Sequence, residues 1–325
     1  MRIKVSSLAA LAGLAMAGLL SHAHAQTYPT RAITIITTGA AGSVSDIMPR
    51  QVADDLSKRL GKPVVVDNRP GGTGLVAANM VLAAPADGYT IWFGPMGTLA
   101  VNPHILKSMP FDPDTAFIPV ALVGSTPLVM VVNPKQVAAK TLEQFIAEAK
   151  SQPDKFAYGS VGPGSTPAIA AAILARRAGI TMTHVPYRGF GPALDAVIKG
   201  EVAMMMSDTG PVLQRLADGS LRALAVTTPK RTTFAPDVPT FKEQNVDLDI
   251  SLWYGLFLRA GTPAAVSDRL AAEMGEVLKD PAFAKSWSSM GIEAGNLAGP
   301  DFAQYFKREQ AKWAAIVPPL GIPRE

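Results

Sequence analysis

Short runs of β-branched residues alternate with helical stretches along almost the whole chain. The first run, Ile33 to Thr37, precedes a stretch of helical character from about Ser45 to Leu60. The pattern returns in the middle of the chain, where Lys155 to Ser160 precedes Thr166 to Ala178. Strands that alternate with helices in this way form parallel sheets covered by helices. The sequence therefore predicts an α/β fold.

Two extended runs are longer than ordinary strands and indicate two lobes. Phe117 to Val132 is interrupted only by a Gly-Ser-Thr-Pro segment, and Leu248 to Leu258 follows a proline-rich stretch. We interpret both runs as crossings between lobes. Lobe 1 is then expected to comprise residues 26–126 and 248–325, and lobe 2 residues 127–247. Small ligands bind in clefts between two such lobes.

Composition excludes several other classes of protein. Of the 325 residues, 48% are hydrophobic and 17% are charged, so the chain can bury enough apolar surface to fold. The 30 Lys and Arg residues against 26 Asp and Glu residues leave a net charge of +4, too small a surplus for a phosphate-binding stripe. We therefore expect no nucleic-acid partner. The absence of cysteine excludes disulfides and thiolate metal sites.

The N-terminus has the three parts of a secretory signal. Arg2 and Lys4 precede an apolar run from Leu8 to Leu20, and an Ala-His-Ala sequence ends at Ala25. Signal peptides combine a basic segment, a short apolar core and small residues at the cleavage site. We expect residues 1–25 to be removed by cleavage after Ala25 and the mature protein to reside in the periplasm.

Loops rich in small and hydroxyl residues follow several of the expected strands. Such loops let backbone N–H groups approach a ligand, and a helix that begins there adds partial positive charge, so they suit an anion. They lie at the carboxyl ends of strands, where ligands bind in open α/β sheets, although an ordinary strand-to-helix turn has a similar composition. The first loop supplies the candidate ligand-binding residues Gly39, Ala40, Ala41, Gly42, Ser43, Ser45 and Asp46. Two further loops supply Met96, Gly97 and Thr98, and Gly162, Gly164, Ser165 and Thr166.

Two other strand ends carry polar side chains that suit a ligand. Tyr187 and Arg188 offer an aromatic face and a cation, which fit a carboxylated ligand, although a surface arginine gives the same pattern. Ser207 and Asp208 follow the three methionines of a later strand. We include all four residues among the ligand-binding candidates.

Signatures of catalysis or of cofactor binding are weak. Once the signal is removed, only His104 and His184 remain as a general base or metal ligand, and we interpret His184 as structural. Gly72 to Ala77 matches G-x-G-x-x-A, but Asp67 to Gly71 separates it from its strand, so we favour a turn over a dinucleotide site. We expect no catalytic residue, no cofactor and no metal.

Several ordered motifs together resemble a known family. They are Tyr28 to Thr34, Val64 to Gly71, Ala84 to Thr90, His184 to Gly189, Leu221 to Thr227, Trp253 to Phe257 and Ala260 to Pro263. In this order they closely resemble the Bug family, the periplasmic solute-binding proteins of tripartite tricarboxylate transporters, over essentially all of the mature chain. The resemblance implies a two-lobed type II periplasmic-binding-protein fold with the ligand cleft between the lobes.

The resemblance also implies a function. In that family the loops matching Gly39 to Asp46 and Gly162 to Thr166 hold a ligand carboxylate, and many relatives have an Asp-Asn pair where this chain has Ser207-Asp208. We expect a monomer that captures a small organic acid, aliphatic or aromatic, by lobe closure and delivers it to membrane permease subunits. Two alternatives stay open: an exported serine hydrolase using Ser165 or Ser45, and a ligand-loaded sensor that docks on a membrane receptor ectodomain.

Overall fold

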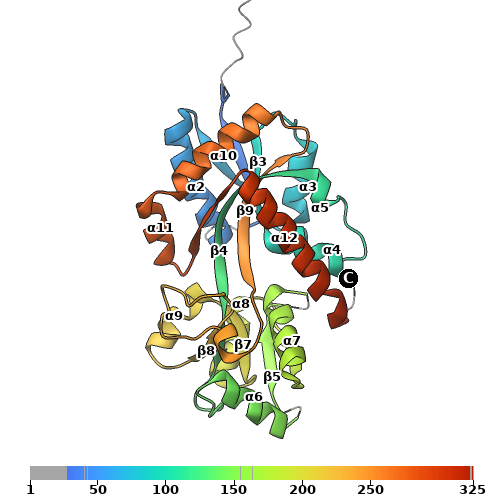
Figure 1. Ribbon diagram of the computed structural model, residues 1–325, viewed down its shortest axis with the longest axis vertical. Helices are drawn as coiled ribbons and strands as arrows, with labels where there is room; N and C mark the ends of the chain where they lie inside the picture. Colours follow the sequence, from blue (N-terminus) through green and yellow to red (C-terminus); the bar gives the residue numbers. More distant parts are fainter. Residues whose placement is uncertain are drawn as a thin grey trace, which may run out of the picture.

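Two lobes, one above the other, make up the computed structural model, which describes residues 28–39, 41, 43–153, 155–162, 164–322 and 324. Figure 1 shows the blue segments and the orange-to-red segments together in the upper lobe, with the green-to-yellow segments in the lower lobe. Segments from both ends of the described chain therefore share one lobe. The expected signal, residues 1–25, lies outside the described residues.

The upper lobe, lobe 1, is a sheet flanked by helices. Its strands are β1 (Ile33–Thr37), β2 (Val64–Asn68), β3 (Thr90–Pro95), β9 (Ser251–Arg259), β10 (Glu293–Ala298) and the first part of β4 (Phe117–Val132). Its longer helices are α2 (Val44–Leu60), α3 (Leu75–Ala83), α10 (Ala264–Leu278), α11 (Pro281–Ser288) and α12 (Pro300–Ile316). Short helical segments are η1 (Gly72–Gly74), η2 (Gly97–Val101), α4 (Asn102–Ile105), α5 (Pro113–Ala116) and η4 (Pro318–Leu320).

The lower lobe, lobe 2, has the same layered construction. Its strands are β5 (Ala157–Ser160), β6 (Thr183–Pro186), β7 (Met204–Asp208), β8 (Arg222–Val226) and the last part of β4. Its helices are α6 (Leu142–Ser151), α7 (Thr166–Ala178), α8 (Phe190–Lys199), α9 (Thr209–Ala217) and the short η3 (Lys242–Gln244). In the described part of both lobes, no helix combines the length and the hydrophobicity needed to cross a membrane.

Strand β4 belongs to both lobes. Residues 117–127 pair with β9, whereas residues 128–132 pair with β7 and β8. The strand order that results is β2-β1-β3-β9-β4-β7-β5-β6. The first long extended run of the sequence is therefore one continuous strand of 16 residues, and its two ends lie in different lobes (Figure 1).

The sheets are mixed, whereas the alternation of strands and helices predicted parallel ones. Strand β1 pairs in parallel with β2 and β3, and β5 pairs in parallel with β6 and β7. The described pairings of β4 and β9 are all antiparallel. The reason is that parallel pairing requires a crossover connection within one sheet, whereas β4 and β9 pass from one lobe to the other. The alternation of strands and helices in the sequence therefore predicts the strand-helix-strand units, but not the pairing of the strands that connect the lobes.

Trp253 fastens the crossing strand β9 to the C-terminal helix α12. The indole is fully buried, and its Nε1 donates to Glu309 Oε2 at 2.9 Å. Glu309 is also buried, accepts from Trp313 Nε1 at 3.3 Å and pairs with Lys312. A buried carboxylate is costly unless it is paired and hydrogen-bonded. Two indoles and one ammonium group meet that requirement here.

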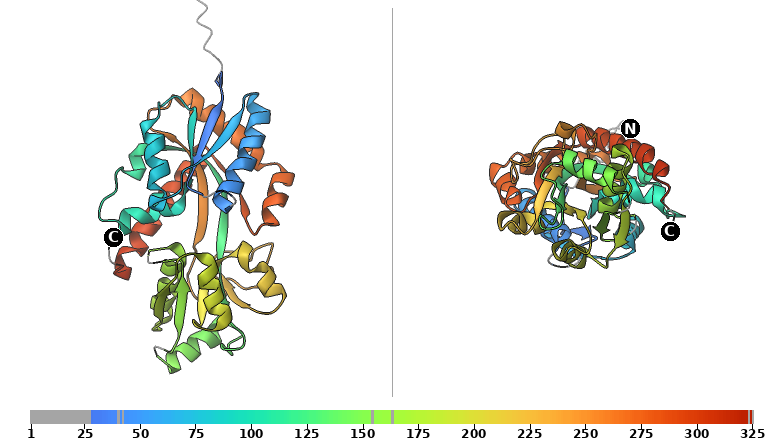
Figure 2. Two further views of the ribbon diagram at one scale, coloured as in Figure 1. Left: turned by 180° about the vertical axis from the view of Figure 1, so that it is seen from behind. Right: turned by 90° about the horizontal axis from the view of Figure 1, so that it is seen from below.

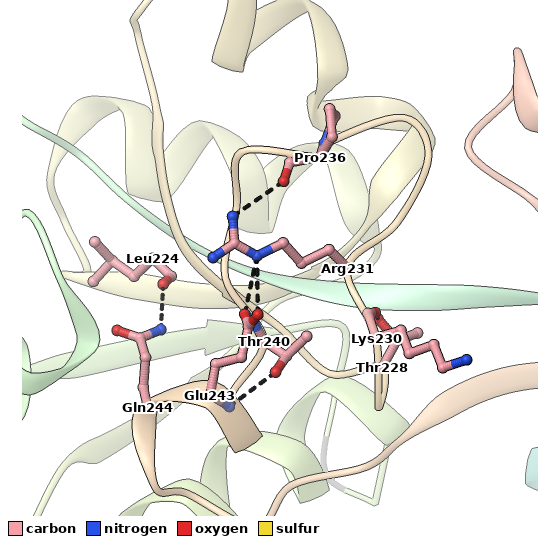
Figure 3. Close-up of polar contacts among 8 residues, drawn as sticks. All are labelled: Leu224, Thr228, Lys230, Arg231, Pro236, Thr240, Glu243 and Gln244. Carbon is pink, nitrogen blue, oxygen red and sulfur yellow. Dashed lines mark hydrogen bonds and ion pairs between the residues drawn. The ribbon is translucent and has the colours of Figure 1, made fainter.

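Polar contacts hold the proline-rich segment that leads from β8 toward β9. Arg231 Nε donates to both carboxylate oxygens of Glu243 at 3.1 Å, and Arg231 Nη1 donates to the Pro236 carbonyl (Figure 3). Thr240 N donates to Glu243 Oε2, and Glu243 N donates to Thr240 Oγ1, which is the reciprocal pattern of a capping box. These contacts hold the segment together, and Gln244 Nε2, which donates to the Leu224 carbonyl at 2.9 Å, ties its end to β8 of lobe 2 (Figure 3).

Replacing Trp253 with Ala should lower the free energy of unfolding by about 3–5 kcal/mol, because it opens a cavity and removes a donor from buried Glu309. Urea denaturation followed by circular dichroism measures the change. The Trp253→Phe variant keeps more of the buried volume and should lose less stability. A loss below about 1 kcal/mol for the alanine variant would contradict the structural role of this residue.

Candidate functional site

A cavity of about 430 Å³ lies between the lobes, at the carboxyl ends of parallel strands. Lobe 1 contributes the loops that follow β1, β2 and β3, and lobe 2 contributes the loop that follows β5. The residues around it are Thr38, Gly71, Thr73, Gly74, Pro95, Gly97, Thr98, Val101, Asn102, Ile105, Leu106, Val161, Gly164, Ser165 and Thr166. Strand ends of this kind are the usual ligand position in α/β sheets.

Two larger cavities lie elsewhere in the molecule. One of about 580 Å³ lies within lobe 1, between α12 and the segments around His104 and Pro113. Another of about 480 Å³ lies beside the crossing strands and has a mixture of acidic and basic side chains around it. Neither brings together strand-to-helix loops from both lobes. We therefore place the candidate site in the 430 Å³ cavity.

Dipoles, and not charged side chains, set the electrostatics of this cavity. Its described lining contains no lysine, arginine, histidine, aspartate or glutamate. The first turns of α3 and α7 open onto it through Gly74 and Thr166, while Val101, Ile105 and Leu106 supply apolar surface. Helix N-termini carry free N–H donors and partial positive charge, which attract anions. The cavity can therefore hold a small anion that has an apolar portion.

Thr73 holds its part of the cavity wall in a strained backbone conformation. Its φ of 50° lies in the left-handed region, which a β-branched residue rarely adopts. Thr98 Oγ1 donates to the Thr73 carbonyl at 2.8 Å, and Asn102 Nδ2 donates to the same carbonyl at 3.1 Å. Backbone strain of this kind persists where surrounding contacts enforce it, and it is common at binding sites. These two donors therefore fix the loop before a ligand arrives.

The loop after β5 caps helix α7 and also touches lobe 1. Ser165 is the N-cap residue, and its Oγ accepts from Ala168 N at 3.4 Å and donates to the Gly162 carbonyl at 2.7 Å. Gly164 has a φ of 69°, and a Cβ there would lie 2.8 Å from Ile105 Cδ1 in lobe 1. The positive φ favours glycine, and a side chain here would have to displace the end of Ile105.

Asp46 supports the loop after β1 from outside the cavity lining. This buried carboxylate pairs with Arg50 at 2.7 Å and accepts from Asn68 Nδ2 at 2.8 Å. The same Asn68 nitrogen donates to the Gly39 carbonyl at 2.8 Å. Asp46 therefore shapes the loop through Asn68. Thr38 is the described residue of this loop that borders the cavity.

The predicted site residues divide between the cavity and its surroundings. Those that border it are Gly97, Thr98, Gly164, Ser165 and Thr166. Those outside its lining are Gly39, Ala41, Ser43, Ser45, Asp46, Met96, Gly162, Tyr187, Arg188, Ser207 and Asp208. Of these, Met96 and Ser207 are fully buried, while Ala41 and Arg188 are exposed. Ala40 and Gly42 lie outside the described residues.

Asp208, Tyr254 and Ser45 form a polar cluster beside the cavity. Tyr254 lies opposite Pro95, a cavity residue, in the pairing of β9 with β3, and its hydroxyl is hydrogen-bonded to Ser45. Burial is the main cause that raises the pKa of Tyr254 to about 12, and the negative charge of Asp208 adds to it. The hydrogen bond with Ser45 acts in the opposite direction and lowers the pKa. Burial raises the pKa of Asp208 to about 6. The cluster thus joins lobe 1, a crossing strand and the end of β7 in lobe 2.

His184 has a structural partner. Its Nε2 lies 2.7 Å from the Oγ of fully buried Ser160, and burial lowers the pKa of its ring. The serines considered for a hydrolase are engaged elsewhere, because Ser165 caps α7 and Ser45 bonds to Tyr254. No serine-histidine pair with Ser165 or Ser45 is therefore formed. Among the described residues, no cluster of three His, Asp or Glu side chains could hold a metal ion.

The loop after β2 forms a wall of the cavity that the sequence did not predict. Its segment Gly71 to Gly74 contains the G-x-G sequence that we interpreted as a turn, yet it borders the cavity. A signal was available, because β2 is a parallel neighbour of β1 and its loop must reach the same sheet edge. The role of Asn102 was not predictable from the sequence. Its side chain donates to the carbonyl of Thr73, and the two residues lie in segments that are distant in the sequence.

Comparison with known proteins gives relatives over nearly the whole chain. Residues 48–322 match the family described as tripartite tricarboxylate transporter family receptor. A protein from the tcbD-tcbE intergenic region of Pseudomonas sp. (strain P51) is 33% identical over 94% of this chain and 92% of its own length. The protein BugT of Bordetella pertussis is 32% identical over 95% of both chains.

Solved structures with the same fold include proteins with bound ligands. A protein of R. palustris with adipate has a TM-score of 0.80 at 29% identity, over 92% of this chain and 100% of that chain. MatC from Rhodopseudomonas palustris with bound malate has a TM-score of 0.74 at 28% identity, over 89% and 100%. The periplasmic binding protein BugD has a TM-score of 0.75 at 26% identity, over 92% and 100%. The predicted two-lobed periplasmic-binding-protein fold is confirmed.

The raised pKa of Asp208 makes its ionised form a cost to the folded protein at neutral pH. The cost is fully present above pH 6 and disappears as the pH falls toward the ordinary value of 3.8, where the carboxyl is protonated in both states. Asp208→Asn should therefore be more stable than the parent at pH 8, by about 1–3 kcal/mol, and not at pH 4.

Urea unfolding of both proteins at the two pH values measures this difference. The matched control is Asp195→Asn, which makes the same charge change on the exposed face of α8 and should alter stability little. The raised pKa would be contradicted by a difference between Asp208→Asn and the parent that is the same at both pH values.

Proposed function

We propose that this chain, which belongs to the tripartite tricarboxylate transporter receptor family, is a periplasmic receptor that captures a small carboxylate. Members of that family are binding proteins and not enzymes. The observation that carries the proposal is the cavity between the lobes. Its described lining is uncharged, and it opens onto the N-termini of α3 and α7. The adipate and malate held by structures of similar fold are both carboxylates, which supports this ligand class.

Affinity of this kind does not require a cationic side chain. Micromolar binding corresponds to about 8.2 kcal/mol. A hydrogen bond to a charged group contributes roughly 1.5–3 kcal/mol, and a helix N-terminus contributes about 0.3–1 kcal/mol. A few backbone and hydroxyl donors from the loops after β2, β3 and β5, together with apolar contact, are enough even after the cost of ordering the ligand.

We propose that capture proceeds by closure of the lobes, with lobe 1 formed by residues 26–126 and 248–325 and lobe 2 by residues 127–247. Contacts between the lobes support this motion. A Cβ on Gly210, in the first turn of α9, would lie 2.9 Å from the Met290 carbonyl oxygen in lobe 1. Thr233 Oγ1 lies 3.1 Å from Ser288 Oγ across the same junction.

Delivery of the ligand to membrane permease subunits completes the proposed cycle. The family is defined by receptors of tripartite transporters, which supports a permease as the partner. Export directed by residues 1–25, with cleavage after Ala25, would bring the receptor to the periplasm, where it would act as a monomer.

Isothermal titration calorimetry with aliphatic and aromatic mono-, di- and tricarboxylates tests the ligand class. At least one of these acids should bind with a Kd in the micromolar range or below. If none of them gives a heat of binding, the proposal is wrong. Gly97→Val should weaken that binding about tenfold or more, because Gly97 borders the cavity and a Cβ there meets no other atom within 4 Å. Gly191→Val is the control, since Gly191 lies on α8 with equally open space around its Cβ.

Gly210→Ala tests closure. The added methyl group would meet the Met290 carbonyl only while the lobes are in contact, and alanine itself favours the helix. The variant should bind ligand more weakly and show a smaller ligand-induced decrease in radius of gyration by small-angle X-ray scattering. Unchanged affinity and an unchanged decrease would speak against closure at this junction.

A further inference from the structure

We propose that Asp208 accepts a hydrogen bond from a donor group of the ligand, so that the receptor prefers a carboxylate that also carries a hydroxyl or ammonium group. The inference rests on the proposed function, since it concerns the same cleft. It assigns a specificity-determining role to a residue that lies outside the lining of the 430 Å³ cavity.

Asp208 stands at the junction of the lobes. It ends β7, opposite Leu128 of the shared strand β4, and the hydroxyl of the next residue, Thr209, donates to the Pro127 carbonyl at 3.0 Å. Strand β7 pairs in parallel with β5, whose following loop borders the cavity. The carboxyl ends of neighbouring parallel strands meet at one sheet edge. Asp208 therefore lies one strand away from the cavity wall, at the same edge.

Within the described part of the chain, the carboxylate of Asp208 has no hydrogen-bond or ion-pair partner. An aspartate at the N-cap usually accepts from a backbone N–H of the first turn, but Asp208 occupies the N-cap of α9 without such a bond. None of the residues that the structure describes forms a hydrogen bond or ion pair with its side-chain oxygens. The side chain is only partly exposed, and a buried polar group without a partner is costly. A donor on the ligand would supply the missing partner.

The surroundings of Asp208 favour a donor over a second carboxylate. The hydroxyls of Tyr254 on β9 and Ser45 on α2 belong to the same cluster, and burial, with no contribution from a cation, sets the pKa of Asp208. A ligand carboxylate placed here would meet a like charge, which is unfavourable. The N-termini of α3 and α7 provide the opposite environment. The electrostatic potential is therefore negative near Asp208 and positive at the two helix N-termini. Such a site selects a ligand with an anionic group at one end and a hydrogen-bond donor at the other.

Titration calorimetry with two matched series tests this preference. One series is pentanoate, 5-hydroxypentanoate and 5-aminopentanoate; the other is benzoate, 4-hydroxybenzoate and 4-(aminomethyl)benzoate. In at least one series a donor-bearing acid should bind about tenfold or more tightly than the unsubstituted acid. Asp208→Asn should reduce the advantage of the ammonium-bearing acid at least threefold and leave the unsubstituted acid bound as before or more tightly. Asp195→Asn, which makes the same change in net charge, should leave the preference intact.

Two results would overturn the inference. In the first, the unsubstituted acids bind at least as tightly as their donor-bearing partners in both series. In the second, Asp208→Asn weakens all members of a series by the same factor, which is what a purely structural role predicts. The proposed function fails in a different way, when neither these acids nor the wider carboxylate panel binds to the parent protein.

Discussion

Strand β4 connects the two lobes by backbone hydrogen bonds on both sides of the junction. Its first part pairs with β9 in lobe 1 and its last part pairs with β7 and β8 in lobe 2. Because one strand runs through both sheets, the parallel strands of each lobe are held with their carboxyl ends toward the other lobe. The views from opposite sides in Figure 1 and Figure 2 show the long strands β4 and β9 running from one lobe into the other.

The electrostatic character of the site follows from this geometry. Loops at the carboxyl ends of strands lead into helices, so the N-termini of α3 and α7 open onto the shared cavity. These dipoles provide positive potential without a lysine or arginine, and neutral donors cost less to desolvate than a buried cation. Thr98 and Asn102 hold Thr73 in its left-handed conformation, so part of the ordering cost is met during folding and not during binding.

Much of this arrangement was predictable from local sequence pattern. The first strand, helix α7 and the long strand β4 have the bounds that the sequence predicted, because each is a largely apolar run between small or polar residues. The antiparallel pairing of β4 and β9 was not predictable, since it depends on which lobe each end of a strand enters. Gly97 and Ser165 border the cavity as predicted, because both lie in loops that follow the carboxyl ends of strands. Met96, next to Gly97, was also predicted to bind ligand, but its side chain is buried in the hydrophobic core. The hydrogen bond from Asn102 to Thr73, and the electrostatic influence of Asp208 on Tyr254, join segments that are distant in the sequence, so a single sequence gives no signal for either.

We propose that main-chain donors at two helix N-termini, one from each lobe, hold the carboxylate of the ligand. A crystal structure of the protein with a bound carboxylate tests it most directly. We expect the carboxylate oxygens to lie about 2.7–3.2 Å from backbone nitrogens or hydroxyls of residues 71–74 and 164–166. A carboxylate paired with an arginine or lysine side chain, away from both helix N-termini, would contradict it.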